Sequence, residues 1–244
     1  MQIDKYQFQK LDPAIYSKSK ILFLPKKLMK TNLLIILVLL FTASCDLLNS
    51  DSKSSDSIGG STDIPINKVG TTFTNNVVVG MTSYKGSIGI TNVSSDGVAT
   101  VKFQAAIPAN VPILQGIKPK YKDASGNLVC EGKFKMTDEG ILDYNNKDHK
   151  PFVLVKYDGK VGDVYTLEKS DGTVIEREIV RKSDSDDFYW NGMIIKTIDV
   201  EQSSNIPGVA NITYFCNHKF GVVAVRVNME DGTKPQLNLV PSQY

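Results

Sequence analysis

The chain has 244 residues, and 41% of them are hydrophobic, so it has enough apolar side chains for a packed core and is not disordered throughout. Residues 1–45 hold seven lysines and two acids, and subtracting these from the totals of 28 and 26 leaves 21 basic and 24 acidic residues. The rest of the chain therefore has a net charge of −3, which is no electrostatic footprint for nucleic-acid binding, since that needs clustered Lys and Arg.

A short apolar run lies near the start of the chain. Residues 33–41 are nine consecutive apolar residues that follow Lys30, and this run is too short for a membrane-spanning helix. The next four residues, Thr42-Ala43-Ser44-Cys45, resemble a lipobox, where the signal peptide of a bacterial lipoprotein is cut and the cysteine thiol is acylated, although Leu is commoner at the position of Thr42. We therefore expect a lipoprotein signal peptide over residues 29–44 and a lipid on Cys45. The alternative is an ordinary signal peptide cut near Ala43 or Ser44.

The segments on either side of this run have separate interpretations. Residues 1–28 form an unusually long leader, whereas Met29 opens a normal signal peptide, so we expect 1–28 to be a wrongly included N-terminal extension. After Cys45, residues 46–62 contain six Ser, three Asp and two Gly, which predicts a flexible linker with a reach of roughly 20–25 Å. Two or more acyl chains anchor a protein stably. The expected location is the cell envelope, with the lipid in the outer membrane.

From residue 63 onward the pattern is that of β-strands. Apolar residues alternate with a period of two between recurrent turn signals such as Asp158-Gly159, Asn191-Gly192 and Asp231-Gly232. In the segment Val98–Phe103, for example, Ala99, Val101 and Phe103 fall on one face. Four further segments read as strands: Val174–Val180, Met193–Val200, Ile212–Phe215 and Phe220–Val227. We therefore predict an all-β fold, an antiparallel meander that forms a half-barrel or a barrel.

Two halves of this region share short matches in the same order. The matched pairs are 68–74 with 160–166, 96–97 with 191–192, 107–108 with 206–207, and 130–134 with 216–220. They indicate two duplicated β units, 63–150 and 151–244, arranged as separate lobes or as halves of one barrel. The alternative is that β-rich sequences resemble one another through composition alone.

The second unit also carries a family resemblance. Residues 151–165, Pro-Phe-Val-Leu-Val-Lys-Tyr-Asp-Gly-Lys-Val-Gly-Asp-Val-Tyr, are followed by a β meander with a late Pro207-Gly208. This stretch resembles uncharacterised secreted lipoproteins of diderm bacteria such as the Bacteroidota, over roughly the last third of the chain. Their usual aromatic after Val-Gly is Trp, whereas this chain has Tyr165 and, in the first unit, Phe73. The resemblance implies a curved half-barrel like that of periplasmic lipid-carrying lipoproteins, and it implies no activity.

Cys130 and Cys216 are the two cysteines that remain once Cys45 is assigned to the lipid. An even pair in an oxidising compartment predicts a disulfide between them. The alternative is two buried free thiols. His218, two residues after Cys216, does not complete the four ligands of a structural zinc site, so we expect no metal.

The sequence contains no recognisable catalytic motif or cofactor loop. His149 lies in a polar linker, and neither it nor His218 has a partner placed by sequence. The run Ser183–Asp187 is rich in oxygen ligands but lacks the Gly and the distant Glu of a calcium-binding EF-hand, which favours a solvated loop over a calcium site. We expect no enzymatic activity and no cofactor.

Three aromatic residues, Phe188, Tyr189 and Trp190, precede the Asn191-Gly192 turn. Strand alternation sends Phe188 and Trp190 to one face and Tyr189 to the other. One interpretation places Phe188 and Trp190 in the core. The other makes the three residues a platform for a sugar ring or an apolar ligand at the mouth of the barrel.

The first functional hypothesis is therefore a non-catalytic binding module that holds an apolar ligand such as a lipid, a glycan or a protein segment on a concave sheet face. The second is a structural or interaction lipoprotein of the envelope without a small-molecule ligand. A hydrolase is a remote third. The expected partners are the membrane, through the lipid anchor, and a lipid, glycan or envelope protein.

Overall fold

The computed structural model describes residues 57–79, 82–106 and 119–242, so the expected signal peptide and Cys45 lie outside the described residues. The described chain consists of antiparallel strands and two short 3-10 turns, η2 (Pro65–Asn67) and η3 (Pro119–Tyr121). The all-β prediction is confirmed, and one of the sheets curls as a half-barrel. No helix within these residues is long and apolar enough to cross a membrane.

The first sheet is a six-stranded meander with one extra strand. Its first six strands pair antiparallel in chain order, and the C-terminal strand β15 pairs with β1. Its strands are β1 (Thr72–Val79), β2 (Thr82–Val93), β3 (Val98–Ala105), β4 (Leu128–Met136), β5 (Gly140–Asp143), β6 (Phe152–Lys156) and β15 (Val240–Pro241). Strand β3 buries Ala99, Val101 and Phe103, the face predicted from the alternation.

The second sheet is also a six-stranded meander. Its strands are β7 (Val164–Glu168), β8 (Val174–Lys182), β11 (Ile198–Ser203), β12 (Val209–Asn217), β13 (Gly221–Met229) and β14 (Gln236–Asn238). A separate hairpin, β9 (Phe188–Trp190) and β10 (Met193–Ile195), is inserted between β8 and β11. The change from one sheet to the other falls between β6 and β7, so residues 152–156 of the second predicted unit pair within the first sheet.

One predicted strand, Met193–Val200, is wrong in extent, because the chain leaves the hairpin at Ile195 and enters the second sheet at Ile198. Side-chain hydrogen bonds hold this break: the Thr197 N–H and the Thr197 hydroxyl donate to Ser183 Oγ (3.1 Å) and Asp199 Oδ1 (2.8 Å). The Asn191-Gly192 turn is confirmed, since both residues have positive φ angles (45° and 81°) at the tip of the hairpin.

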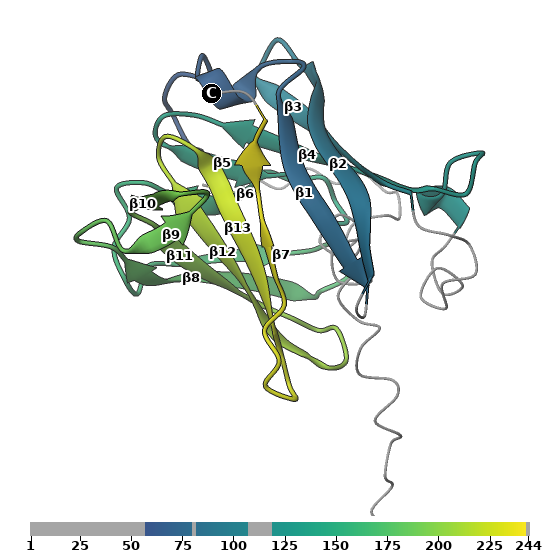
Figure 1. Cartoon of the computed structure of the whole chain (residues 1–244). Helices are drawn as coiled ribbons and strands as arrows, with labels where there is room; N and C mark the ends of the chain where they lie inside the picture. The colour runs from purple at the N-terminus through teal and green to yellow at the C-terminus, as the bar shows by residue number, and fades with distance from the viewer. Residues whose placement is uncertain (1–56, 80–81, 107–118, 243–244) are drawn as a thin grey trace, which may run out of the picture.

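The C-terminal segment joins the two sheets. Gln236–Asn238 pairs with β13 of the second sheet, Leu239 donates its N–H to the Val223 carbonyl (2.9 Å), and Val240–Pro241 pairs with β1 of the first sheet. In Figure 1 this yellow segment runs beside β13 and reaches the blue strand β1. The two meanders are therefore continuous on this side, while β6 and β7 are the strands at which they end on the other side.

Both sheets contribute to a shared core. The main cluster of buried apolar residues includes Phe103 and Leu128 from the first sheet and Ile179 and Val200 from the second, each 0% exposed. A smaller cluster surrounds Trp190 beneath the hairpin, and another places Ile58, from the end of the linker, on Leu142 and Val153. The two sheets are thus parts of a single packed structure.

The matched segments 68–71 and 160–163 adopt the same turn at the start of each meander. Each turn is closed by a hydrogen bond from its fourth to its first residue and has a Gly with a φ near +90°, Gly70 at 89° and Gly162 at 92°. Each Gly N–H donates to an Ile carbonyl of the second strand, Ile90 (2.9 Å) or Ile179 (2.8 Å). The match between 96–97 and 191–192 is not equivalent, because the first lies between β2 and β3 and the second at the tip of the inserted hairpin. Residues 107–108 lie outside the described residues.

Candidate functional site

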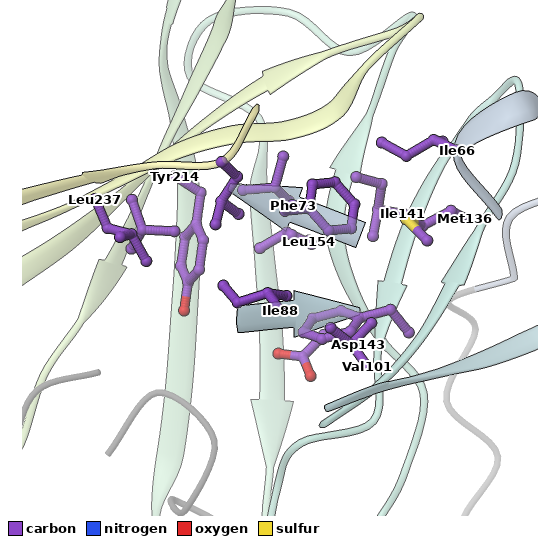
Figure 2. A pocket seen from close by; sticks show the side chains of 14 residues that line it. Ile66, Phe73, Ile88, Val101, Met136, Ile141, Asp143, Leu154, Tyr214 and Leu237 are labelled. Carbon is purple, nitrogen blue, oxygen red and sulfur yellow. The ribbon is translucent and has the colours of Figure 1, made fainter. Parts of the chain in front are cut away.

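A cavity of about 100 Å³ lies between the two sheets. Twelve of its lining side chains are apolar, and the two polar ones are Asp143 and Tyr214. Figure 2 shows Phe73, Leu154, Ile88 and Ile141 around the cavity, with Leu237 and Tyr214 on the side of the second sheet. The apolar lining consists of Ile66, Phe73, Ile88, Val101, Phe134, Met136, Ile141, Leu154, Val222, Val225, Leu237 and Leu239.

Strand pairing explains why these side chains meet. Phe73 of β1 lies opposite Ile88 of β2, and directly opposite residues of antiparallel strands share a face of the sheet. On the second sheet, Tyr214, Val225 and Leu237 form one row across β12, β13 and β14. The cavity is the space that these two inward faces leave unfilled.

A buried ion pair lies at the polar end of the cavity. Arg177 of β8 is 2% exposed, and its Nη2 donates to Asp143 Oδ2 of β5 (2.5 Å). Its Nη1 donates to the Val153 carbonyl of β6 (3.1 Å), and its Nε donates to Gln202 Oε1 of β11 (2.8 Å). Arg177 therefore connects the second sheet to the two last strands of the first.

Two aromatic rings pack against this guanidinium. Its Cζ lies 4.3 Å from the ring centroid of Phe152 and 5.6 Å from that of Tyr214, within the range of cation–π attraction. Burial raises the pKa of Tyr214 to about 12, so this hydroxyl stays protonated at neutral pH. Figure 2 shows the Tyr214 hydroxyl and the Asp143 carboxylate toward the same end of the cavity.

A second, more polar pocket of about 120 Å³ adjoins the cavity, since Asp143 and Tyr214 line both. The turn after β7 contributes Lys169, and the segment after β5 contributes Asn145. Asn145 Oδ1 accepts the Lys133 N–H (2.7 Å), whereas the buried Asn145 Nδ2 has no acceptor within the described chain. The pocket also has polar walls from Gln202, Ser203, Ser204 and Asn205.

The predicted disulfide is wrong, because Cys130 and Cys216 are free thiols. Cys130 lies on β4 and Cys216 on β12, in different sheets, and each packs into the main core as a small apolar group. Burial raises the pKa of the Cys130 thiol to about 12 and also raises the pKa of the Cys216 thiol. Neither cysteine lines the cavity or the polar pocket.

Of the two interpretations of this segment, the core interpretation is confirmed: Trp190 lies in the buried cluster beneath the hairpin and Phe188 packs against it. Neither residue lines the cavity, so the platform interpretation is wrong for these two. Trp190 is 1% exposed and donates its Nε1–H to the carbonyls of Val223 and Leu239 (both 3.2 Å), and Phe188 stacks on Phe215 with centroids 4.9 Å apart. Tyr189 is 73% exposed on the opposite face, as the alternation predicts.

The residues weighed as metal ligands lie apart. His149 and His218 are both exposed, and the run Ser183–Asp187 closes on itself, because Ser183 Oγ and Arg181 Nη2 both donate to the Asp187 carboxylate. Across the described ranges no group of three or more His, Cys, Asp or Glu side chains is placed to hold a metal ion.

The sequence reasoning missed Arg177 and Asp143. A signal existed for Arg177, since it alternates with Ile175 and Ile179 on β8, so a charged side chain occupies an inward position of that strand. No comparable signal marks Asp143, which joins the site through the curvature of the first sheet. Comparisons of the chain with protein-family models, with curated proteins and with solved structures found no match.

Proposed function

We propose that this chain is a lipid-anchored protein of the bacterial cell envelope whose β domain is a non-catalytic binding module for an apolar group. The inter-sheet cavity carries this proposal, because twelve apolar side chains surround a space that packed cores normally fill. An apolar lining favours a lipid-like group over a glycan. Asp143 is the only acid in that lining, and it pairs with Arg177, so a pair of catalytic carboxylates has no support at this site.

The size of the cavity limits what it holds. A cavity of about 150 Å³ accepts benzene, or about 25 Å³ per carbon atom, so a volume of about 100 Å³ holds on the order of four carbons. The expected occupant is therefore a short apolar chain, or one end of a longer chain that extends out of the cavity.

Binding can be tested by NMR on the full chain with Cys45→Ser, which has no acyl group of its own to compete for the cavity. With isoleucine methyl groups labelled, titration with xenon, which is smaller than benzene and fits the cavity, should shift the signals of Ile88 and Ile141, which line the cavity, and leave that of Ile195 beneath the hairpin unchanged. Leu237→Phe should weaken binding by filling the cavity, whereas Val180→Phe on the exposed face of β8 should not. Unchanged cavity signals at the highest xenon pressure would refute the binding proposal.

The proposed attachment to the membrane depends on Cys45 and the small residues that precede it. Mass spectrometry of the membrane-bound chain should find Cys45 as an acylated N-terminal residue, and Cys45→Ser should release the protein from the membrane fraction. An unmodified Cys45 in the mature product would contradict the lipoprotein assignment and would leave the binding proposal untouched.

A second candidate function is an interaction role, favoured by the exposed face of the β9–β10 hairpin. Tyr189 and Ile194 lie directly opposite each other and are 73% and 59% exposed, and Met193 beside them is 42% exposed. A photo-crosslinking residue at Ile194 should join one envelope protein if this face is an interface, and the same residue at Val180 should not. If the crosslinking residue gives the same crosslinked products at Ile194 and at Val180, the proposed interaction role of the hairpin is refuted.

A further inference from the structure

The cavity and the polar pocket adjoin at two common lining residues. The inference drawn from this arrangement rests on the proposed function and makes its ligand more specific. Asp143 and Tyr214 line both spaces, so a chain that occupies the two passes these two side chains. The cavity lining is apolar on every other side, while the pocket has amide, hydroxyl and ammonium groups. An apolar space that adjoins a polar one matches the form of an amphiphile.

Charge distinguishes among the possible head groups. The polar pocket has three charged residues, Asp143, Lys169 and Arg177. The ion pair between Arg177 and Asp143 neutralises two of them, whereas Lys169 has no carboxylate partner within the described ranges. The pocket therefore carries one unmatched positive charge, which favours a monoanionic group.

A buried donor adds an independent requirement. Asn145 Nδ2 is shielded from solvent and has no acceptor within the described chain, and leaving such a group unpaired is unfavourable. A ligand oxygen in the pocket would accept this N–H. One ammonium group and one amide donor together suit the two oxygens of a carboxylate.

We propose that the cavity and the polar pocket are the tail and head compartments of one site, and that its ligand is a single-chain amphiphile of the fatty-acid class, bound through its carboxylate by Lys169 and Asn145. The tail compartment holds on the order of four carbons, so medium-length chains already reach both compartments. Affinity should rise by about fourfold per methylene until the tail compartment is full.

The test uses the full chain with Cys45→Ser and three probes of equal length: octanoate, octanol and octylamine. Octanoate should shift the methyl signals of Ile88 in the tail compartment and of Ile212 in the head compartment along one saturation curve. It should bind at least tenfold more tightly than octanol, and octylamine should bind most weakly.

Two variants test the head group directly. Lys169→Met should lower the affinity for octanoate about tenfold and leave that for octanol unchanged, Lys169→Arg should retain octanoate binding, and Lys160→Met on an exposed turn should have no effect. Asn145→Asp keeps the acceptor for the Lys133 N–H but replaces the free donor by a negative charge, so it should also weaken octanoate.

The outcomes distinguish a failure of the fatty-acid proposal from a failure of the proposed binding function. Equal affinities for octanoate and octanol, with no effect of Lys169→Met, would overturn the carboxylate assignment while xenon binding still supported the binding module. Shifts confined to Ile88 or to Ile212 would overturn the single two-compartment site. Absence of binding by xenon and by all three amphiphiles would overturn both.

Discussion

Arg177 links the two sheets across the gap between β6 and β7, the strands at which the meanders end. Its guanidinium donates to Asp143 of β5 and to the Val153 carbonyl of β6 and lies against the ring of Phe152. No backbone ladder joins β6 to β7, and side-chain hydrogen bonds such as those of Arg177 cross between the two sheets here. The pair is buried, so removing either partner leaves an uncompensated charge in the interior.

We predict that Arg177→Met lowers the free energy of unfolding by about 3–5 kcal/mol, because Asp143 then remains buried without its cation. The double variant Arg177→Met with Asp143→Leu should recover most of this loss, since no buried charge remains unpaired. Urea denaturation of the four proteins in the cycle measures the coupling between the two residues. If Arg177→Met lowers the free energy of unfolding by less than about 1 kcal/mol, the ion pair does not stabilise the junction of the two sheets.

The two core cysteines lead to a prediction about reactivity. Thiols react as thiolates, and burial raises the pKa of the Cys130 thiol to about 12, so the reactive form is scarce at neutral pH. In the folded chain with Cys45→Ser, a thiol reagent should label neither Cys130 nor Cys216, and both should react after unfolding. A reducing agent should leave the melting temperature unchanged. The opposite result would be that the unfolded chain reacts with the reagent only after a reductant is added. That result would show that Cys130 and Cys216 form a disulfide.

At the scale of elements, the repeated Lys-Val-Gly turn is the clearest structural sign of a duplication. It begins both meanders with the same hydrogen bonds, and its Gly70 and Gly162 have φ angles of 89° and 92°. A Cβ at either position would meet no atom within 4 Å. The need for glycine therefore comes from the backbone conformation and not from crowding.

We predict that Gly70→Ala and Gly162→Ala each lower the free energy of unfolding by about 1–2 kcal/mol, since an L-residue is strained at such a φ. The double variant should lose about the sum of the two. Gly89→Ala is the matched control, because Gly89 packs beside the first turn, has no positive φ and would place its Cβ at an ordinary 3.4 Å from the Thr71 carbonyl. If Gly89→Ala has a lower melting temperature than Gly70→Ala and Gly162→Ala, the positive φ angles are not the reason for glycine in these turns.

Much of the β structure was predictable, because strand alternation and glycine turns are local signals. The buried face of Val98–Phe103 and the Asn191-Gly192 turn followed from them directly. The break between Ile195 and Ile198 did not, because one of the two Thr197 hydrogen bonds that hold it goes to Ser183, 14 residues away in the sequence. The candidate site was least predictable, since the meeting of Asp143 with Arg177 depends on how two curved sheets pack together.

At the scale of the whole molecule, the C-terminal segment makes two meanders into one packed structure. It pairs with β13 through Gln236–Asn238 and with β1 through Val240–Pro241, and it places Leu237 and Leu239 in the cavity wall. Its Leu239 carbonyl also accepts the Trp190 Nε1–H (3.2 Å). One short segment thus supports the core, the cavity and the hairpin cluster together.

We predict that a chain ending at Pro235 loses xenon binding and shifts its tryptophan emission to longer wavelength. Without β14 and β15, Trp190 loses one carbonyl acceptor and its cluster loses Val240, while β1 and β13 become unpaired edges that promote association. Asn238→Ala, on the exposed side of the same segment, should change neither signal. Because Trp190 is the only tryptophan, its emission reports this region alone. An unshifted emission together with intact xenon binding would show that the two meanders form the core without the C-terminal segment.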